Sequence, residues 1–135
     1  MTATGVLGLG TDLVEVDRFR LALERQGARL LDRIFSDAER AYAFRHRNAA
    51  PHLAARFGAK EAVMKALGVG LWKFALRDVE VIRLPSGQPT VALYDKAAEL
   101  ADARSVTAWQ LTLTHSDSMA AATAIALGDG ATTLG

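Results

Sequence analysis

The spacing of apolar residues changes about halfway along the chain, and this change limits the folds that the chain can adopt. In the first half, apolar residues recur at helical spacing, as Phe57 and Met64 do. In the second half they alternate with polar residues, as Leu111 and Leu113 do, which is typical of a half-buried strand. A run of helices followed by strands favours an α+β fold, with an antiparallel sheet and helices packed on one face.

The length and composition fit a single domain. The chain has 135 residues, half of them hydrophobic, which is enough to form one core. We find no repeat or linker, and therefore expect one domain over residues 1–127. Residues 128–135 are mostly small or polar, and we expect them to form a disordered tail.

Charge and residue types exclude several classes of function. The chain has 16 Lys and Arg residues against 15 Asp and Glu residues, so no overall field favours nucleic acid or an anionic membrane as a partner. The absence of cysteine excludes disulfides, thiolate zinc sites and thiol catalysis. No segment approaches the roughly 20 apolar residues of a membrane helix, and the N-terminus has no signal-peptide pattern. We therefore expect a soluble, cytoplasmic protein.

A glycine-rich apolar segment near the N-terminus predicts a buried strand. Gly5, Gly8 and Gly10 punctuate its apolar residues, and glycine in a strand permits the close approach of another backbone. We expect the strand to end just before Asp12. An aspartate at that position is most often a turn or cap residue, but a strand end is also a place where ligand sites gather.

Helices are expected between this strand and residue 68. The first begins at about residue 17, and Gly27 marks a possible break in it. Ser36 and Glu39 have the spacing of a capping box, which predicts the start of the next helix. Pro51 suits the first turn of a third helix, which ends where Gly68 follows.

The second half predicts strands and one more helix. Residues 79–84 and 90–94 form strand-like runs, and the short segment between them predicts a hairpin. A short helix is expected over residues 95–103. Residues 109–114 alternate as a half-buried strand, and residues 119–127 can return antiparallel after a turn.

The third helix carries an unusual density of charge. Arg56, Lys60, Glu61 and Lys65 place three cations and one carboxylate along ten residues of an otherwise apolar segment. Lys60 interrupts the apolar face, where a lysine commonly extends its ammonium group into water. Glu61 and Lys65 have the spacing of an exposed ion pair worth about 0.3–0.5 kcal/mol. Phosphates bound with a metal ion would also explain this group of charges.

Asp12 and Glu61 together are a candidate magnesium site. Magnesium takes hard oxygen ligands, usually one or two carboxylates completed by substrate phosphates and waters. The chain has no Walker loop, and its N-terminal glycines do not have the spacing of the dinucleotide fingerprint. Phosphate binding therefore falls to side chains.

His115 is expected at a strand end, where it is either a structural histidine or a ligand-binding residue. In the first case, Ser116 and Asp117 are ordinary turn residues. A Ser, His and Asp hydrolase is a weak alternative, because the chain has no nucleophile elbow of the Gly-x-Ser-x-Gly kind.

These segments resemble the holo-acyl-carrier-protein synthases along nearly the whole chain. Residues 10–19 (GTDLVEVDRF) resemble the first motif of that family, Gly-x-Asp followed at a fixed distance by arginine. Residues 56–68 (RFGAKEAVMKALG) are similar to its second motif, aromatic-x-x-Lys-Glu-Ala-x-x-Lys. Residues 113–116 (LTHS), followed by 119–122 (MAAA), resemble a third and looser element. Gly58 stands where the family usually has alanine or serine, Gln88 where lysine is common, and Ser116 where threonine or an acidic residue is usual.

The resemblance implies a 4'-phosphopantetheinyl transferase fold and activity, in which a carrier-protein serine attacks the β-phosphate of coenzyme A. It implies that Asp12 and Glu61 bind Mg²⁺ and that Lys65 contacts the transferred phosphoryl group. Glu61, acting through water, is the first candidate for the general base, and a metal-bound water is the other. Arg56 and His115 would bind the nucleotide end of coenzyme A, and Lys60 and Ser116 are further candidates there.

The resemblance also implies a small acidic carrier protein as partner and a homotrimer with sites between subunits. Arg18, Arg25 and Arg29 recur at steps of seven and four, and we interpret them as a docking stripe on the first helix. The alternative for these arginines is an ordinary solvated helix face. Two other functions remain open: a non-catalytic adaptor that binds an acidic helical partner, and a magnesium-dependent hydrolase of nucleotide pyrophosphates.

Overall fold

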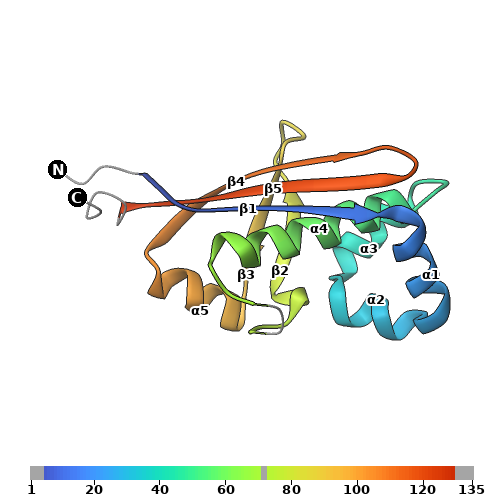
Figure 1. Cartoon of the computed structure of the whole chain (residues 1–135), viewed down its shortest axis with the longest axis horizontal. Coiled ribbons are helices and arrows are strands. Elements are labelled where there is room, and N and C mark those ends of the chain that lie inside the picture. Colours follow the sequence, from blue (N-terminus) through green and yellow to red (C-terminus); the bar gives the residue numbers. More distant parts are fainter. Residues whose placement is uncertain (1–4, 71–72, 130–135) are drawn as a thin grey trace.

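The computed structural model describes residues 5–70 and 73–129. Figure 1 shows three long strands along one side of the molecule and the helices packed beneath them. In chain order the elements are β1 (Gly5–Glu15), α1 (Val16–Gln26), α2 (Ala28–Ile34), α3 (Asp37–Phe44), α4 (Ala50–Ala66), a 3-10 turn η1 (Leu76–Asp78), β2 (Val79–Arg83), β3 (Pro89–Leu93), α5 (Asp95–Ala103), β4 (Val106–His115) and β5 (Met119–Gly128). The expected α+β class, with an antiparallel sheet and helices on one face, is confirmed.

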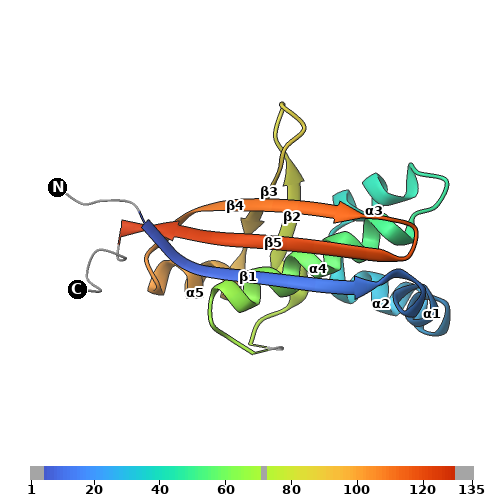
Figure 2. The same ribbon diagram turned by 45° about the horizontal axis from the view of Figure 1, so that its top comes forward.

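The strands form two sheets. β1, β5 and β4 lie in that order in an antiparallel sheet, with Leu9 opposite Ile125 and Gln110 on the other side of Ile125. β2 and β3 form the predicted hairpin as a separate pair. Figure 2 shows this hairpin crossing the three-stranded sheet and extending beyond it.

Helix α4 lies against the inner face of the three-stranded sheet and is the centre of the core. It is buried nearly all around, because the alanines of β5 cover one side and α1, α3 and β2 cover others. Two glycines of β1 make this contact possible. A Cβ atom at Gly8 would lie 1.8 Å from the carbonyl oxygen of Ala66, and one at Gly10 would lie 1.9 Å from that of Ala62.

Several local predictions are confirmed. Gly27, with φ of +58°, separates α1 from α2, and Ser36 and Glu39 form a reciprocal capping box at the start of α3. Pro51 lies in the first turn of α4, and Gly68, with φ of +72°, follows its end. Within the described ranges, no helix combines the length and apolar character needed to cross a lipid bilayer.

Three placements differ from the predictions. β1 does not end before Asp12: it pairs with β5 as far as Glu15, so that Asp12 lies inside the strand, opposite Ala122. The break at Gly27 puts Arg29 on α2, and the three arginines therefore do not share one helix. Gly128 is the buried last residue of β5 rather than part of a tail, and residues 130–135 of the predicted tail lie outside the described residues.

Candidate active site

Asp12, Glu61 and Lys65 come together where β1 passes α4. The Lys65 ammonium donates to the carbonyl oxygen of Thr11 at 2.8 Å and to Oδ1 of Asp12 at 3.1 Å. Asp12 is largely enclosed, with 18% of its side chain exposed, whereas the Lys65 side chain is 54% exposed. The side-chain partner of Lys65 is thus Asp12, which lies 53 positions away in the sequence. An exposed ion pair between Lys65 and Glu61, the alternative prediction, would have paired Lys65 with Glu61 instead.

The two carboxylates are close enough to influence each other. Burial raises the pKa of Glu61, the negative charge of Asp12 raises it further, and the Lys65 ammonium partly opposes both effects. Both carboxylates line an open cavity of about 410 Å³ together with Arg18 and Phe57. Glu61 and Phe57 also line a second, more apolar cavity of about 800 Å³ between α2, α4 and η1.

These residues fit a magnesium ion that is completed by a substrate. Among the described residues, no group of three or more His, Asp or Glu side chains could hold a metal by itself. Two neighbouring carboxylates that repel each other are the donor set expected for Mg²⁺ when phosphate oxygens and waters supply the other ligands. A bound cation would also relieve the repulsion that raises the Glu61 pKa.

Arg56 and His115 belong to a second cluster. The Arg56 guanidinium carbon lies 4.0 Å from the centre of the Tyr42 ring. The residue is only 4% exposed, and its buried Nε has no hydrogen-bond partner among the described residues. The His115 ring packs against His52 at 4.8 Å. Five positions separate Arg56 from Glu61 on α4, which places them about 140° apart around the helix. One chain therefore presents the two clusters on different faces of α4.

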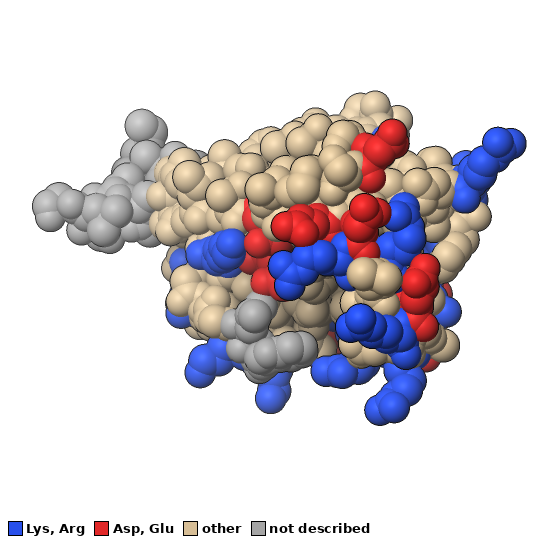
Figure 3. Space-filling view, turned by 45° about the vertical axis from the view of Figure 1, so that its right-hand side comes forward, with Lys and Arg blue, Asp and Glu red and all other residues tan. Residues whose placement is uncertain are grey.

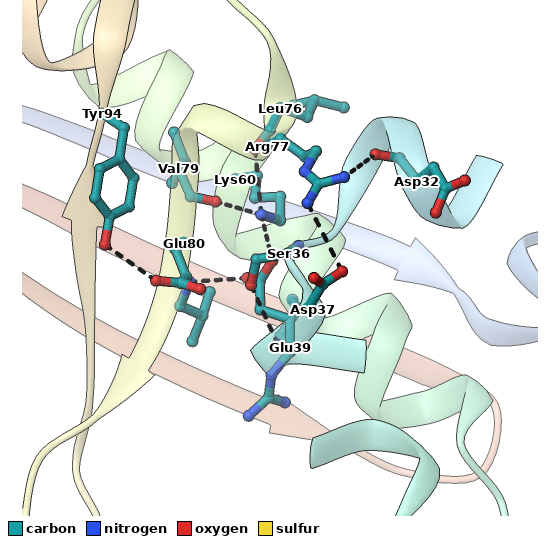
Figure 4. Close-up of polar contacts among 12 residues, drawn as sticks. Asp32, Ser36, Asp37, Glu39, Lys60, Leu76, Arg77, Val79, Glu80 and Tyr94 are labelled. Carbon is teal, nitrogen blue, oxygen red and sulfur yellow. Dashed lines mark hydrogen bonds and ion pairs between the residues drawn. The ribbon is translucent and has the colours of Figure 1, made fainter. Parts of the chain in front are cut away.

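The structure contradicts both predictions for Lys60, that its ammonium extends into water and that it binds phosphate. It is fully buried, and its ammonium donates to Oε1 of Glu39 at 2.8 Å, to the carbonyl oxygen of Leu76 at 3.2 Å and to that of Val79. Figure 4 shows this ion pair joining α3, α4 and the start of β2. Its three donors are used inside the protein, and we therefore remove Lys60 from the residues expected to bind phosphate.

The remaining predicted residues lie on the surface. Arg18 and Arg25 are exposed on α1, and Arg29 is exposed on α2. Figure 3 shows acidic side chains gathered over the middle of the face that α1 helps to form, with Lys and Arg side chains beside and below them. The Ser116 hydroxyl accepts from the backbone N–H groups of Ser118 and Met119, which fits the turn-residue reading.

Sequence reasoning missed three residues of these clusters. Glu39 was recognised as a cap residue but not as the partner of Lys60, because the two are 21 positions apart. His46 and His52 were not selected, although His52 stands four positions before Arg56 and such residues share a helix face. This spacing was the available signal for His52.

Comparisons with known proteins agree with the fold and with the family resemblance. The chain matches the family model of the 4'-phosphopantetheinyl transferase superfamily over residues 8–124. It is 49% identical over 123 residues to a holo-[acyl-carrier-protein] synthase of Desulforudis audaxviator, which covers 91% of this chain and 94% of that protein.

Two solved structures of proteins named acyl carrier protein synthases have a similar fold. The acyl carrier protein synthase of Plasmodium yoelii with ADP bound has a TM-score of 0.84 and 27% identity, over 93% of this chain and 98% of that one. The holo-(acyl-carrier-protein) synthase of Bacillus anthracis in complex with CoA (3',5'-ADP) has a TM-score of 0.75 and 26% identity, over 93% and 99%. With the family model covering most of its length and its motif residues gathered around β1 and α4, the chain belongs to the 4'-phosphopantetheinyl transferase superfamily.

Proposed function

We propose that this protein transfers the 4'-phosphopantetheine group of coenzyme A to a serine of an apo acyl carrier protein. The products are the holo carrier protein and adenosine 3',5'-bisphosphate. The observation that carries the proposal is the meeting of Asp12, Glu61 and Lys65, from two motifs far apart in the chain, beside an open cavity. The names of the curated relative and of the two solved structures support the same activity.

The chemistry follows from the charges at this site. The serine oxygen attacks the β-phosphorus of coenzyme A, the bond from that phosphorus to the bridging oxygen breaks, and adenosine 3',5'-bisphosphate leaves. Asp12 and Glu61 would hold Mg²⁺, which supplies charge neutralisation on the pyrophosphate. The Lys65 ammonium lies beside Asp12 and can stabilise the charge that develops on the transferred group. Glu61, whose pKa is raised, is suited to accept the serine proton through a water molecule.

A homotrimer with sites between subunits would unite the two clusters. In one chain, the cluster of Arg56 and His115 lies on a different side of α4 from Glu61. One coenzyme A molecule must nevertheless contact both clusters. The outer face of the three-stranded sheet also exposes Val6, Leu9 and Leu13 at 56%, 63% and 68%. Neighbouring apolar residues of this kind mark interaction surfaces. We therefore propose that subunits pack through this sheet face and bring Arg56 and His115 of one copy toward Asp12 of another.

We propose that Arg18, Arg25 and Arg29 dock an acidic carrier protein. Arg18 lines the same cavity as Asp12 and Glu61, so a carrier bound at Arg18 would have its serine near the carboxylates. Arg29 extends this basic surface onto α2. We also propose a cytoplasmic location, because a cysteine-free chain has no structural need for an oxidising compartment.

The test is a transfer assay analysed by mass spectrometry. The protein is mixed with an apo carrier protein, coenzyme A and Mg²⁺, and the expected result is one phosphopantetheine added to the carrier. Asp12→Ala and Glu61→Ala should abolish transfer while thermal melting shows that they stay folded. Cleavage of coenzyme A without a carrier would instead indicate a hydrolase. Carrier binding without Mg²⁺ and without transfer would indicate an adaptor.

A further inference from the structure

The three histidines of the chain gather at one place, although they stand at positions 46, 52 and 115. The rings of His46 and His52 are stacked, with centroids 3.7 Å apart and planes inclined by 22°. The rings of His52 and of His115, at the end of β4, form a T-shaped contact with centroids 4.8 Å apart. His52 lies in the first turn of α4, and His46 follows the end of α3. Three separate segments thus contribute one imidazole each.

Among the described residues, the charges that act on His52 are those of His46, His115 and Arg56, and all of them disfavour its protonated form. Tyr42 of α3 packs at 6.0 Å from its ring, and Arg56 of α4 lies over the same tyrosine. Arg83 of β2 donates to the Tyr42 hydroxyl and lies 5.3 Å from the Tyr42 ring centre. The carboxylate of Glu39 acts on Arg56, but it is already paired with Lys60.

This environment keeps His52 neutral in the free protein at pH 7. Burial, followed by the charges of His46, His115 and Arg56, lowers the pKa of His52 to about 4. Arg56, whose buried Nε has no partner among the described residues, adds a donor that an anion could satisfy. A dianion placed here would reverse the sign of the field around His52 and favour its protonated form.

We propose that the cluster of His46, His52 and His115 takes up a proton when a phosphate dianion, the 3'-phosphate of coenzyme A, binds beside Arg56, and that His52 is the residue that gains it. The inference rests on the proposed function, in which Arg56 and His115 meet the nucleotide end. His52 would then make the affinity for 3'-phosphorylated nucleotides depend on pH.

Proton linkage sets the size of the effect. The pKa of His52 is about 4 in the free protein, and the proposal gives it a higher pKa in the complex. At a pH between these two pKa values, the complex holds a proton that the free protein lacks. Binding therefore strengthens as pH falls through that window. In the limit of one full proton, the Kd decreases about tenfold for each unit of pH. The nucleotide phosphate itself gains a proton near pH 6, so wild type and variant must be compared with the same ligand.

The experiment measures proton uptake by calorimetry at pH 7 in buffers of different ionisation enthalpy, with adenosine 3',5'-bisphosphate as ligand. Wild type should take up a fraction of a proton that His52→Phe does not. Lys96→Gln, which removes an exposed cation from α5, is the control and should behave as wild type. If His52→Phe is not folded, His52→Gln replaces it. In wild type, NMR should show one of three histidine signals titrating at higher pH when the nucleotide is bound.

Three outcomes overturn the inference. Equal proton uptake by wild type and His52→Phe, or none by wild type, refutes it even when nucleotide binding and transfer are intact. Failure of wild type to bind the nucleotide and to transfer phosphopantetheine refutes the proposed function, and this inference with it.

Discussion

Replacing Lys60 by methionine would leave the buried carboxylate of Glu39 without its cation. Both side chains are 0% exposed, and Nζ of Lys60 lies 2.8 Å from Oε1 of Glu39. The carboxylate keeps two backbone donors, the N–H of Ser36 at 2.9 Å and that of Val81 at 2.8 Å. Methionine has a similar length and packs well, so that the change mainly removes the charge and three hydrogen bonds.

The expected loss is about 3–5 kcal/mol, the usual cost of removing one partner of a buried ion pair. A domain of ordinary stability has about 5–15 kcal/mol in total, so this single change removes a large part of it. For a chain of this length the melting temperature should fall by about 10–20 °C. The double variant Glu39→Leu with Lys60→Met should lose less than the sum of the two single variants, because neither charge then remains buried alone.

The assay is urea unfolding at pH 7, followed by tryptophan fluorescence and checked by circular dichroism. Lys96→Met on α5 is the matched control, because it makes the same substitution at an exposed position. A loss below about 1 kcal/mol for Lys60→Met would show that the ion pair does not hold α3 and β2 against α4. Additive losses in the double variant would show that the two charges are not coupled.

Three other predictions concern the strand contact, the histidine cluster and the catalytic charges. Gly10→Ala should cost at least about 3 kcal/mol in urea unfolding, because its Cβ would lie 1.9 Å from a backbone oxygen of α4, whereas Gly70→Ala meets no atom within 4 Å and should be tolerated. Wild type should lose stability as pH falls from 6.5 toward about 4, where the unfolded chain binds a proton that His52 in the folded protein does not, and thermal melting of His52→Phe should depend less on pH in that range. Steady-state kinetics should show that Lys65→Ala mainly lowers kcat and that Arg56→Ala mainly raises the KM for coenzyme A; equal effects of the two variants would contradict the assigned roles.

Near neighbours in the sequence determined much of the fold. The capping box at Ser36 and Glu39, the hairpin of β2 and β3 and the helix over residues 95–103 were predictable from sequence, because each depends on spacing over a few residues. The glycines of β1 also indicated a close backbone contact. The motif residues were sufficient to identify the family, because the order and spacing of three short segments can be recognised in the sequence without knowing their tertiary contacts.

The tertiary structure alone decided which distant residues meet. β1 continues past Asp12 because it pairs with β5 as far as Glu15, which the glycines near its start could not indicate. The carboxylate of Asp12 accepts a hydrogen bond from Lys65 of α4. Lys60 was expected at the surface, but Glu39 and two carbonyl groups offer its ammonium partners inside the protein. Burial of a charge depends on such partners, which lie 16–21 positions away and leave no periodic signal in the sequence. The stacking of His46 on His52 likewise exists because the segment after α3 folds back onto the start of α4.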